Sequence, residues 1–295
     1  EVRKGLAFEP NNVLLLGRSA GDELQLGQWA AGTEHYRKAA LLDPQNAALL
    51  SLLGNAELRQ RHYPQADSAT ARSLALTPDN LFVIEQEIVL HLMRGDLSGA
   101  RAVTHRLPVS VDPSALVAYL GTYEDLGWVL DRAQERLLLS LGDDAFDNDP
   151  VARAIVFAQQ YRYRGDSSRM RAYADTARVG FARQLEQVPS DHQRQVIYGL
   201  ALSYLGRKAE AISYGEKSVG TSTTTSNTIA LYDRHQLARI YLALGEKEKA
   251  LDNLEILLKV PYYLSPERLR IDPNFAPLRG NPRFERMAAG AALAN

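Results

Sequence analysis

Six histidines are the residues with the clearest capacity for metal or proton-transfer chemistry: His35, His62, His91, His105, His192 and His235. A zinc site on a helix needs two imidazoles on one face, as an HExxH spacing provides. Neither that spacing nor His-x-His occurs in the sequence. We therefore expect structural or surface roles for the histidines and no metal site among them.

A cluster of acidic residues follows the middle of the chain and could suggest calcium chemistry: Asp143, Asp144, Asp147 and Asp149. An EF-hand loop needs glycine at its sixth position and glutamate at its twelfth, where Ala154 stands instead. Asp149 precedes Pro150, a pair that predicts a helix N-cap with proline at the first helical position. The cluster therefore indicates a helix start, and we expect no cofactor.

Sequence motifs for covalent or phosphoryl chemistry are missing. The chain has no Gly-rich phosphate loop, no Gly-x-Ser-x-Gly elbow, no kinase signature and no cysteine. A formal net charge of −1 provides no general attraction for nucleic acid or anionic lipid. No apolar run approaches the roughly 18 residues that span a bilayer. We expect a protein that is not an enzyme, binds no nucleic acid directly and does not insert into a membrane in this segment.

A repeat of 34 residues organises the first third of the chain. The turn positions Gly27, Arg61 and Gly95 follow this step. A small residue stands five positions after each of them: Gly32, Ala66 and Ala100. Such residues allow two helices to approach closely, and prolines 34 residues apart end the second helices, at Pro44 and Pro78. Each unit is therefore predicted to be a helix hairpin that buries its apolar face against its neighbours.

The first two repeats resemble tetratricopeptide repeats over their full length, and 34 residues is the period of that family. Their first helices are expected from Val13 to about Leu26 and from Ala47 to about Gln60. The resemblance implies an all-α fold, an α-solenoid of about seven helix hairpins. The tryptophans are expected to pack inside it, Trp29 at the start of a second helix and Trp128 at a turn.

Later hairpins follow the pairing of a turn residue with a small residue five positions on. This pairing recurs as Trp128 with Ala133, Gly206 with Ala211 and Gly245 with Ala250, whereas Gly165 is followed by Met170. We expect a repeat array over residues 1–260, regular over 13–107, degenerate over 108–191 and regular again over 192–260. A capping segment is expected over 261–295.

The final segment, VPYYLSPERLRIDPNFAPLRGNPRFERM, resembles the closing segment of tetratricopeptide regions in bacterial multidomain regulators. Such regions are joined to serine/threonine kinase, winged-helix or adenylate-cyclase modules. Ser265-Pro266 and Asn281-Pro282 predict two helix starts. The apolar residues of the segment are expected to plug the open end of the solenoid, as terminal repeats must: Leu269, Ile271, Phe275, Leu278 and Phe284.

In the family, the first helix of each pair lines a concave groove that receives a peptide or a partner helix. Transferred to this sequence, the groove residues are Arg18, Asn55, Arg59, Gln86, Tyr119, Gln159, Arg162, Tyr163, Tyr204, His235 and Arg239. Arginine and tyrosine dominate interface energies, and arginine pairs with carboxylates, so a protein or peptide partner is expected, with an acidic one favoured. The clamp for acidic chaperone tails is not reproduced, because Gly17 and Gly21 replace its lysine and asparagine.

Three interpretations of function stay open. The first is an interaction or sensory module of a larger bacterial signalling protein, since the start EVRKGLAFEP suggests a part excised from something longer. The second is an architectural segment that packs on an attached catalytic domain and has no ligand of its own. The third is an enzyme with a site hidden in residues 108–190. The threonine-rich stretch Thr221–Thr228 is expected to be a linker, with phosphorylation as the alternative. Neither the compartment nor self-association follows from the sequence.

Overall fold

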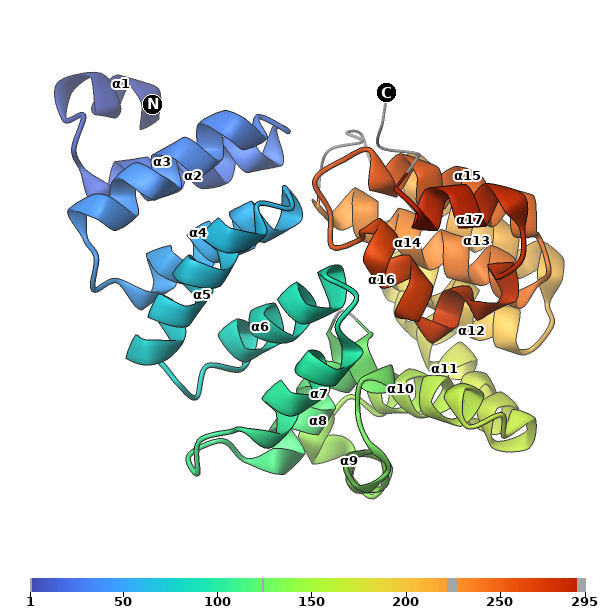
Figure 1. Ribbon diagram of the computed structural model, residues 1–295. Helices are drawn as coiled ribbons and strands as arrows, with labels where there is room; N and C mark the ends of the chain where they lie inside the picture. Colours follow the sequence, from blue (N-terminus) through green and yellow to red (C-terminus); the bar gives the residue numbers. More distant parts are fainter. Residues whose placement is uncertain (1, 124, 222–227, 291–295) are drawn as a thin grey trace.

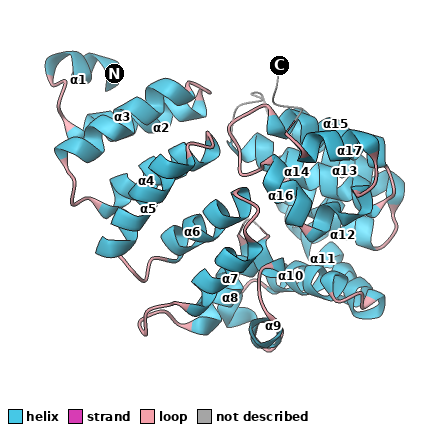
Figure 2. Cartoon of the chain, viewed as in Figure 1, coloured by secondary structure: helices cyan, strands magenta, loops and turns pink. Residues whose placement is uncertain are grey.

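The computed structural model describes residues 2–123, 125–221 and 228–290, and this part of the chain is helical without strands (Figures 1 and 2). After α1 (Val2–Phe8), seven hairpins follow one another along an arc. They are α2 (Val13–Gln25) with α3 (Trp29–Leu42), α4 (Ala47–Arg59) with α5 (Tyr63–Leu76), α6 (Leu81–Met93) with α7 (Leu97–His105), α8 (Pro113–Thr122) with α9 (Arg132–Leu138), α10 (Pro150–Tyr163) with α11 (Ser167–Gln187), α12 (His192–Tyr204) with α13 (Lys208–Thr221), and α14 (Thr228–Ala243) with α15 (Lys247–Leu258). The prediction of an all-α solenoid is confirmed.

Side-chain caps start the first helices of the hairpins. Asn12 and Asn46 each accept a hydrogen bond from the backbone N–H three residues on, at 3.1 Å. Asp149 accepts from the N–H of Val151 at 2.7 Å, with Pro150 at the first helical position, as the sequence predicted. These caps satisfy backbone donors that the helices leave unpaired. They fix where these first helices begin.

Left-handed residues make the turns inside the hairpins. Gly27, Gly95, Gly165, Gly206 and Gly245 have φ between 74 and 79°, a region that costs glycine little. Arg61 adopts the same conformation, with φ of 62°, although it has a side chain. At Gly32 an added Cβ would lie 2.8 Å from the carbonyl oxygen of Ala20, so the two helices of that hairpin approach too closely for any other residue.

The degenerate middle of the chain departs from a simple hairpin. Trp128 does not form a turn between α8 and α9. It lies in a short 3-10 helix, η1 (Leu126–Trp128), and is 7% exposed. Trp128 differs from the predicted turn because burial of apolar side chains holds this stretch inside the protein: Leu126, Val129 and Leu130 around it are buried too. A second 3-10 helix, η2 (Asp143–Phe146), precedes α10.

The C-terminal segment does more than plug the open end of the array. It contains α16 (Pro266–Ile271), η3 (Pro273–Leu278) and α17 (Pro282–Ala288). α16 and α17 start at the predicted caps Ser265 and Asn281, and η3 starts at Asp272. α17 packs on α15, at the end of the array, but α16 packs on α6 and η3 on α14 (Figure 1). The expected plug therefore continues back across the concave side. Its apolar residues join one core cluster with residues of α6 and α14.

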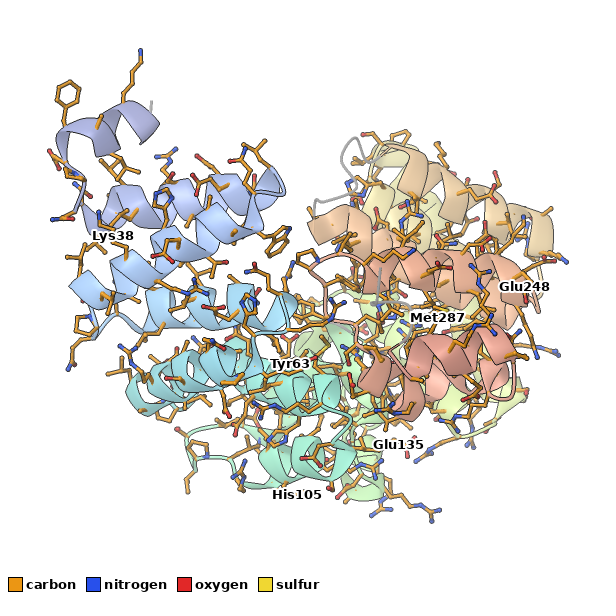
Figure 3. The ribbon with its side chains drawn as sticks, turned by 45° about the horizontal axis from the view of Figure 1, so that its top comes forward. Lys38, Tyr63, His105, Glu135, Glu248 and Met287 are labelled. Atoms are coloured by element: carbon orange, nitrogen blue, oxygen red, sulfur yellow. The ribbon has the colours of Figure 1, made fainter. Side chains whose placement is uncertain are left out.

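One cross-contact shows how this return is fixed. Ser265 Oγ donates to the carbonyl oxygen of Met93 at the end of α6, at 2.7 Å. Tyr63, labelled in Figure 3, donates to the same carbonyl from α5 at 3.2 Å. Within residues 2–123, 125–221 and 228–290, no helix combines the length and the apolar character needed to cross a bilayer.

Candidate interaction surface on the concave wall

The predicted groove residues differ widely in exposure. Only Arg18 is exposed, and Asn55, Tyr119, Arg162 and Tyr163 are half-buried. The other six are buried: Arg59, Gln86, Gln159, Tyr204, His235 and Arg239. Most of the set therefore faces other parts of this chain, and the contacts below show which ones.

At the end of α4, the C-terminal segment covers two of these residues. Asn55 Nδ2 donates to the hydroxyl of Tyr263. The guanidinium carbon of Arg59 lies 4.2 Å from the centre of the Tyr263 ring and 5.9 Å from that of Trp29. Cation–π contacts of this kind gain strength when they are shielded from water. The part of the wall nearest the hairpin turns is therefore occupied by the chain itself.

At the end of α10, Asn274 of η3 covers two further residues of the predicted groove. Its Oδ1 accepts hydrogen bonds from Arg162 Nη1 at 3.0 Å and from the Tyr163 hydroxyl at 3.3 Å. Arg162 also lies over the ring of Tyr204, 5.7 Å from its centre. Burial raises the pKa of Tyr163, so its hydroxyl stays protonated and acts as a donor.

His235 of α14 is held between aromatic rings of the same segment. Its Nδ1 lies 3.1 Å from the Tyr262 hydroxyl, and its ring stacks on Phe275 with centroids 5.7 Å apart. Burial, followed by the positive charges of Arg268 and Arg239, lowers the pKa of His235 well below its usual range. The imidazole is therefore neutral at pH 7, which suits an apolar contact rather than binding of an acidic partner.

A buried ion pair occupies the middle of the wall. Arg239 Nη1 lies 2.8 Å from Asp125 Oδ2, and the side chains are 3% and 8% exposed. Gln159 donates to Asp125 Oδ1 at 3.0 Å, and the Tyr232 hydroxyl donates to Oδ2 at 3.3 Å. Burial acts to lower the pKa of Arg239, but Asp125 and nearby tyrosines outweigh it and raise the pKa well above its usual range. The guanidinium of Arg239 therefore stays charged.

Asp125 is central to these buried contacts, but it was not identified from the sequence. It stands in the irregular connection after α8, and its backbone is left-handed with φ of 53°. No motif or spacing marks such a residue, because its partners lie on α10 and α14, far along the chain. Charge within an apolar stretch, DLGWVL, is the single signal that could have drawn notice.

The remaining part of the concave wall is open to solvent. Leu52 precedes Asn55 by three residues and Arg59 by seven, so it lies on the same face of α4. Its side chain is 41% exposed. Leu14 at the start of α2 and Phe82 at the start of α6 are two repeat steps apart, so they occupy the same position in their repeats. They are 79% and 38% exposed. Arg18 lies one turn after Leu14. The accessible wall is thus an apolar strip with one arginine, which we call the open strip: Leu14, Arg18, Leu52 and Phe82.

Among the described residues, no three His, Asp or Glu side chains converge in a group that could hold a metal ion. The hairpins, their left-handed turns and the 34-residue step define an all-α helical repeat protein that resembles the tetratricopeptide type, and its concave wall is partly filled by its own C-terminal segment.

Comparisons with known proteins give similarity in structure alone. No protein-family model matches the chain, and no curated protein has a matching sequence. Among solved structures, the chain is similar to a tetratricopeptide repeat protein from Parabacteroides merdae, with 18% identity, a TM-score of 0.45, and coverage of 85% of this chain and 93% of the other. It is also similar to PilW, a type IV pilus biogenesis factor, with 12% identity, a TM-score of 0.38, and coverage of 89% and 96%.

Proposed function

We propose that this chain is a scaffold for protein–protein interaction, and that it binds a segment of another protein along the open strip. The observation that carries this proposal is the alignment of large exposed apolar side chains on consecutive first helices, with Leu14 79% and Leu52 41% exposed. Burying such side chains on a partner is worth about 25 cal/mol per Å² of apolar area. An amphipathic partner segment fits a strip of this kind.

Arg18 gives the partner segment a further feature. Its guanidinium is exposed beside Leu14 and takes part in no hydrogen bond or ion pair with the described residues. A carboxylate on the partner would form a charge-assisted hydrogen bond there. The partner is therefore proposed to combine apolar residues with at least one acidic residue. The other arginines predicted for the groove are engaged within the chain.

The test compares one substituted pair on the open strip with a matched pair elsewhere. Affinity capture with the intact chain is repeated with Leu14→Asp/Arg18→Glu, and with Leu41→Asp/Arg171→Glu as the control. Leu41 is 80% exposed on α3, and Arg171 is exposed on α11. We expect the first pair alone to lose the captured partner. Equal capture by both variants would refute the open strip as the binding surface.

We further propose that the scaffold belongs to a larger bacterial signalling protein. Support comes from the resemblance of residues 260–287 to the closing segments of tetratricopeptide regions in multidomain regulators. The full-length gene tests this, because it should encode a kinase, winged-helix or cyclase module beside this chain. The purely architectural role is favoured by one observation, the occupation of the turn-side wall by the C-terminal segment. It predicts that no partner is lost in either variant.

A further inference from the structure

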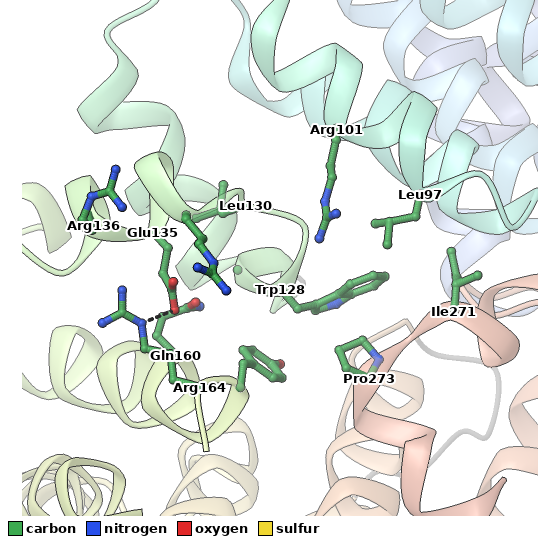
Figure 4. Close-up of a pocket in the computed structure, with 13 residues that line it drawn as sticks. Leu97, Arg101, Trp128, Leu130, Glu135, Arg136, Gln160, Arg164, Ile271 and Pro273 are labelled. Atoms are coloured by element: carbon green, nitrogen blue, oxygen red, sulfur yellow. Dashed lines mark hydrogen bonds and ion pairs between the residues drawn. The ribbon is translucent and has the colours of Figure 1, made fainter. Parts of the chain in front are cut away.

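A pocket lies apart from the open strip, at the edge of the array that contains the hairpin turns. Its volume is about 780 Å³, and it is bordered by the beginnings of α7 and α9, by η1, by the end of α10 and by the C-terminal segment (Figure 4). We call it the turn-edge pocket. Small-molecule sites commonly have volumes of about 300–1,000 Å³. The pocket is therefore of a size to hold a metabolite rather than a water cluster.

Positive charge gathers in the turn-edge pocket. Four arginines line it, Arg101, Arg132, Arg136 and Arg164, against one acidic residue, Glu135. The chain as a whole has a net charge of −1, so the excess belongs to this place. A concave site lined by one sign of charge raises the local concentration of ions of the opposite sign. The pocket therefore favours an anion.

The arginines retain donors for such an anion. Glu135 binds Arg164 Nε at 2.8 Å and accounts for one guanidinium. Arg101 Nε donates to the carbonyl oxygen of Val129 at 3.0 Å, which holds the side chain in place and leaves its terminal nitrogens available. Arg132 and Arg136 make no hydrogen bond or ion pair with the described part of the chain. In Figure 4, Arg101 points toward Trp128, whereas Arg136 lies at the rim.

Trp128 forms part of the pocket wall, and its ring lies across the pocket in Figure 4. Leu97, Leu130 and Ile271 give the pocket apolar sides next to the indole. The lining thus combines donors for oxygens with a flat apolar surface.

We propose that the turn-edge pocket binds a small molecule that carries carboxylate or phosphate oxyanions on a planar apolar body. Guanidinium groups bind both oxyanions through paired hydrogen bonds, which is the chemistry that the two sources share. The indole and its neighbours bind the planar body. This site differs from the open strip in location and in ligand, so it goes beyond the scaffold function.

Fluorescence of Trp128 provides the direct test. Trp29→Phe leaves Trp128 as the remaining tryptophan, since the sequence has two. Phenyl phosphate and phthalate are titrated into this protein at low salt, with neutral benzamide as the control. We expect a saturable change with an anion and none with benzamide. A response to phenyl phosphate alone identifies a phosphate ligand, a response to phthalate alone a carboxylate ligand, and a response to both a general oxyanion site.

Two arginine variants make the result specific. Arg132→Gln and Arg101→Gln/Arg132→Gln should weaken binding, the double variant by at least about tenfold. Arg171→Gln/Arg183→Gln, on the exposed side of α11, should leave it unchanged. Arg132 is exposed, so its single variant retains the fold if the double variant does not. Absence of saturation by either anion up to about 10 mM, or equal binding by all variants, overturns the proposal.

Discussion

At the scale of single residues, the Asp125–Arg239 pair decides the character of the concave wall. Both side chains are enclosed; Tyr232 donates to the same carboxylate oxygen as Arg239, Oδ2, and Gln159 donates to the other, Oδ1. Such pairs add little over an apolar contact when complete, but they cost much when one partner is removed. The pair therefore fixes how the connection after α8 meets α14.

Asp125→Asn should lower the free energy of unfolding by about 3 kcal/mol, because it leaves the charge of Arg239 buried without a counter-ion. Asparagine tolerates the left-handed backbone of residue 125, so strain does not contribute. Urea unfolding measures the loss. Asp67→Asn removes an exposed partner of Arg94 at 3.4 Å and should change stability by less than about 0.5 kcal/mol. Similar losses in both variants would contradict the role of the buried pair.

Asp96, the N-cap of α7, should make stability depend on acid pH. Hydrogen bonds from the Gly99 N–H and then from Ser98 and His91 lower its pKa from 3.8 to about 2. The stabilisation is therefore complete above the unfolded value and is lost as pH falls from about 4 toward 2. Asp96→Asn keeps a capping oxygen without the charge, so its urea midpoint should fall less over this window.

A suitable comparison for Asp96 is Asp79, which is exposed in the turn after α5. Asp79→Asn should follow the wild-type protein through the same pH range. If the Asp96 and Asp79 variants respond to acid alike, the cap does not contribute the expected pH dependence.

At the scale of elements, the turn between α4 and α5 explains why arginine stands where the other regular hairpins have glycine. Arg61 Nη2 donates to the carbonyl oxygens of Leu258 and Leu264, each at 2.9 Å. The end of α15 leaves such carbonyls unpaired, and the guanidinium satisfies them. The strained backbone of Arg61 is thus offset by contacts with the other end of the chain.

Arg61→Gly should lower the free energy of unfolding by about 1–2 kcal/mol. It relieves about 1 kcal/mol of backbone strain, but it removes several charge-assisted hydrogen bonds. Arg61→Asn, which also tolerates a left-handed backbone, should behave in the same way. Chemical denaturation of both variants measures the balance. A more stable glycine variant would mean that strain outweighs the contacts.

At the scale of the whole molecule, the C-terminal segment joins hairpins that lie on opposite sides of the arc. Its contacts reach Asn55 on α4, Met93 at the end of α6 and Arg162 on α10, as well as α14 and α15. In a linear array each hairpin depends on its neighbours alone. Here distant hairpins also depend on one another through this segment.

Deletion of residues 261–295 should therefore weaken hairpins on both sides of the arc, besides lowering solubility through exposure of the last pair. Amide hydrogen exchange should speed up in α4 and α6 as well as in α14 and α15, because all four lose packing. Phe275→Ala, which opens a cavity beside His235, should give a milder form of the same pattern, at a cost of about 3–5 kcal/mol. If exchange becomes faster in α14 and α15 alone, the segment caps the end of the array and does not stabilise the distant hairpins.

Local chemistry determined the hairpins. Apolar periodicity, prolines and capping residues predicted first helices from Val13 to about Leu26 and from Ala47 to about Gln60, and the structure ends them at Gln25 and Arg59. These signals act within a few residues, so they can be read along the chain. The prediction of a hairpin turn at Trp128 was wrong because burial of the neighbouring apolar residues prevailed over the repeat pattern.

Only the tertiary structure decided which inner-wall residues are accessible. Asn55 meets Tyr263, which is 208 residues away, and Gln236 donates to Asp125 across 111 residues. Contacts over such separations leave no period or spacing in the sequence, since they depend on how the arc curves and where the C-terminal segment returns. The sequence by itself therefore determined a helical repeat with a polar inner wall. The return of its own C-terminal segment determined which of those residues are covered, and it left the open strip exposed.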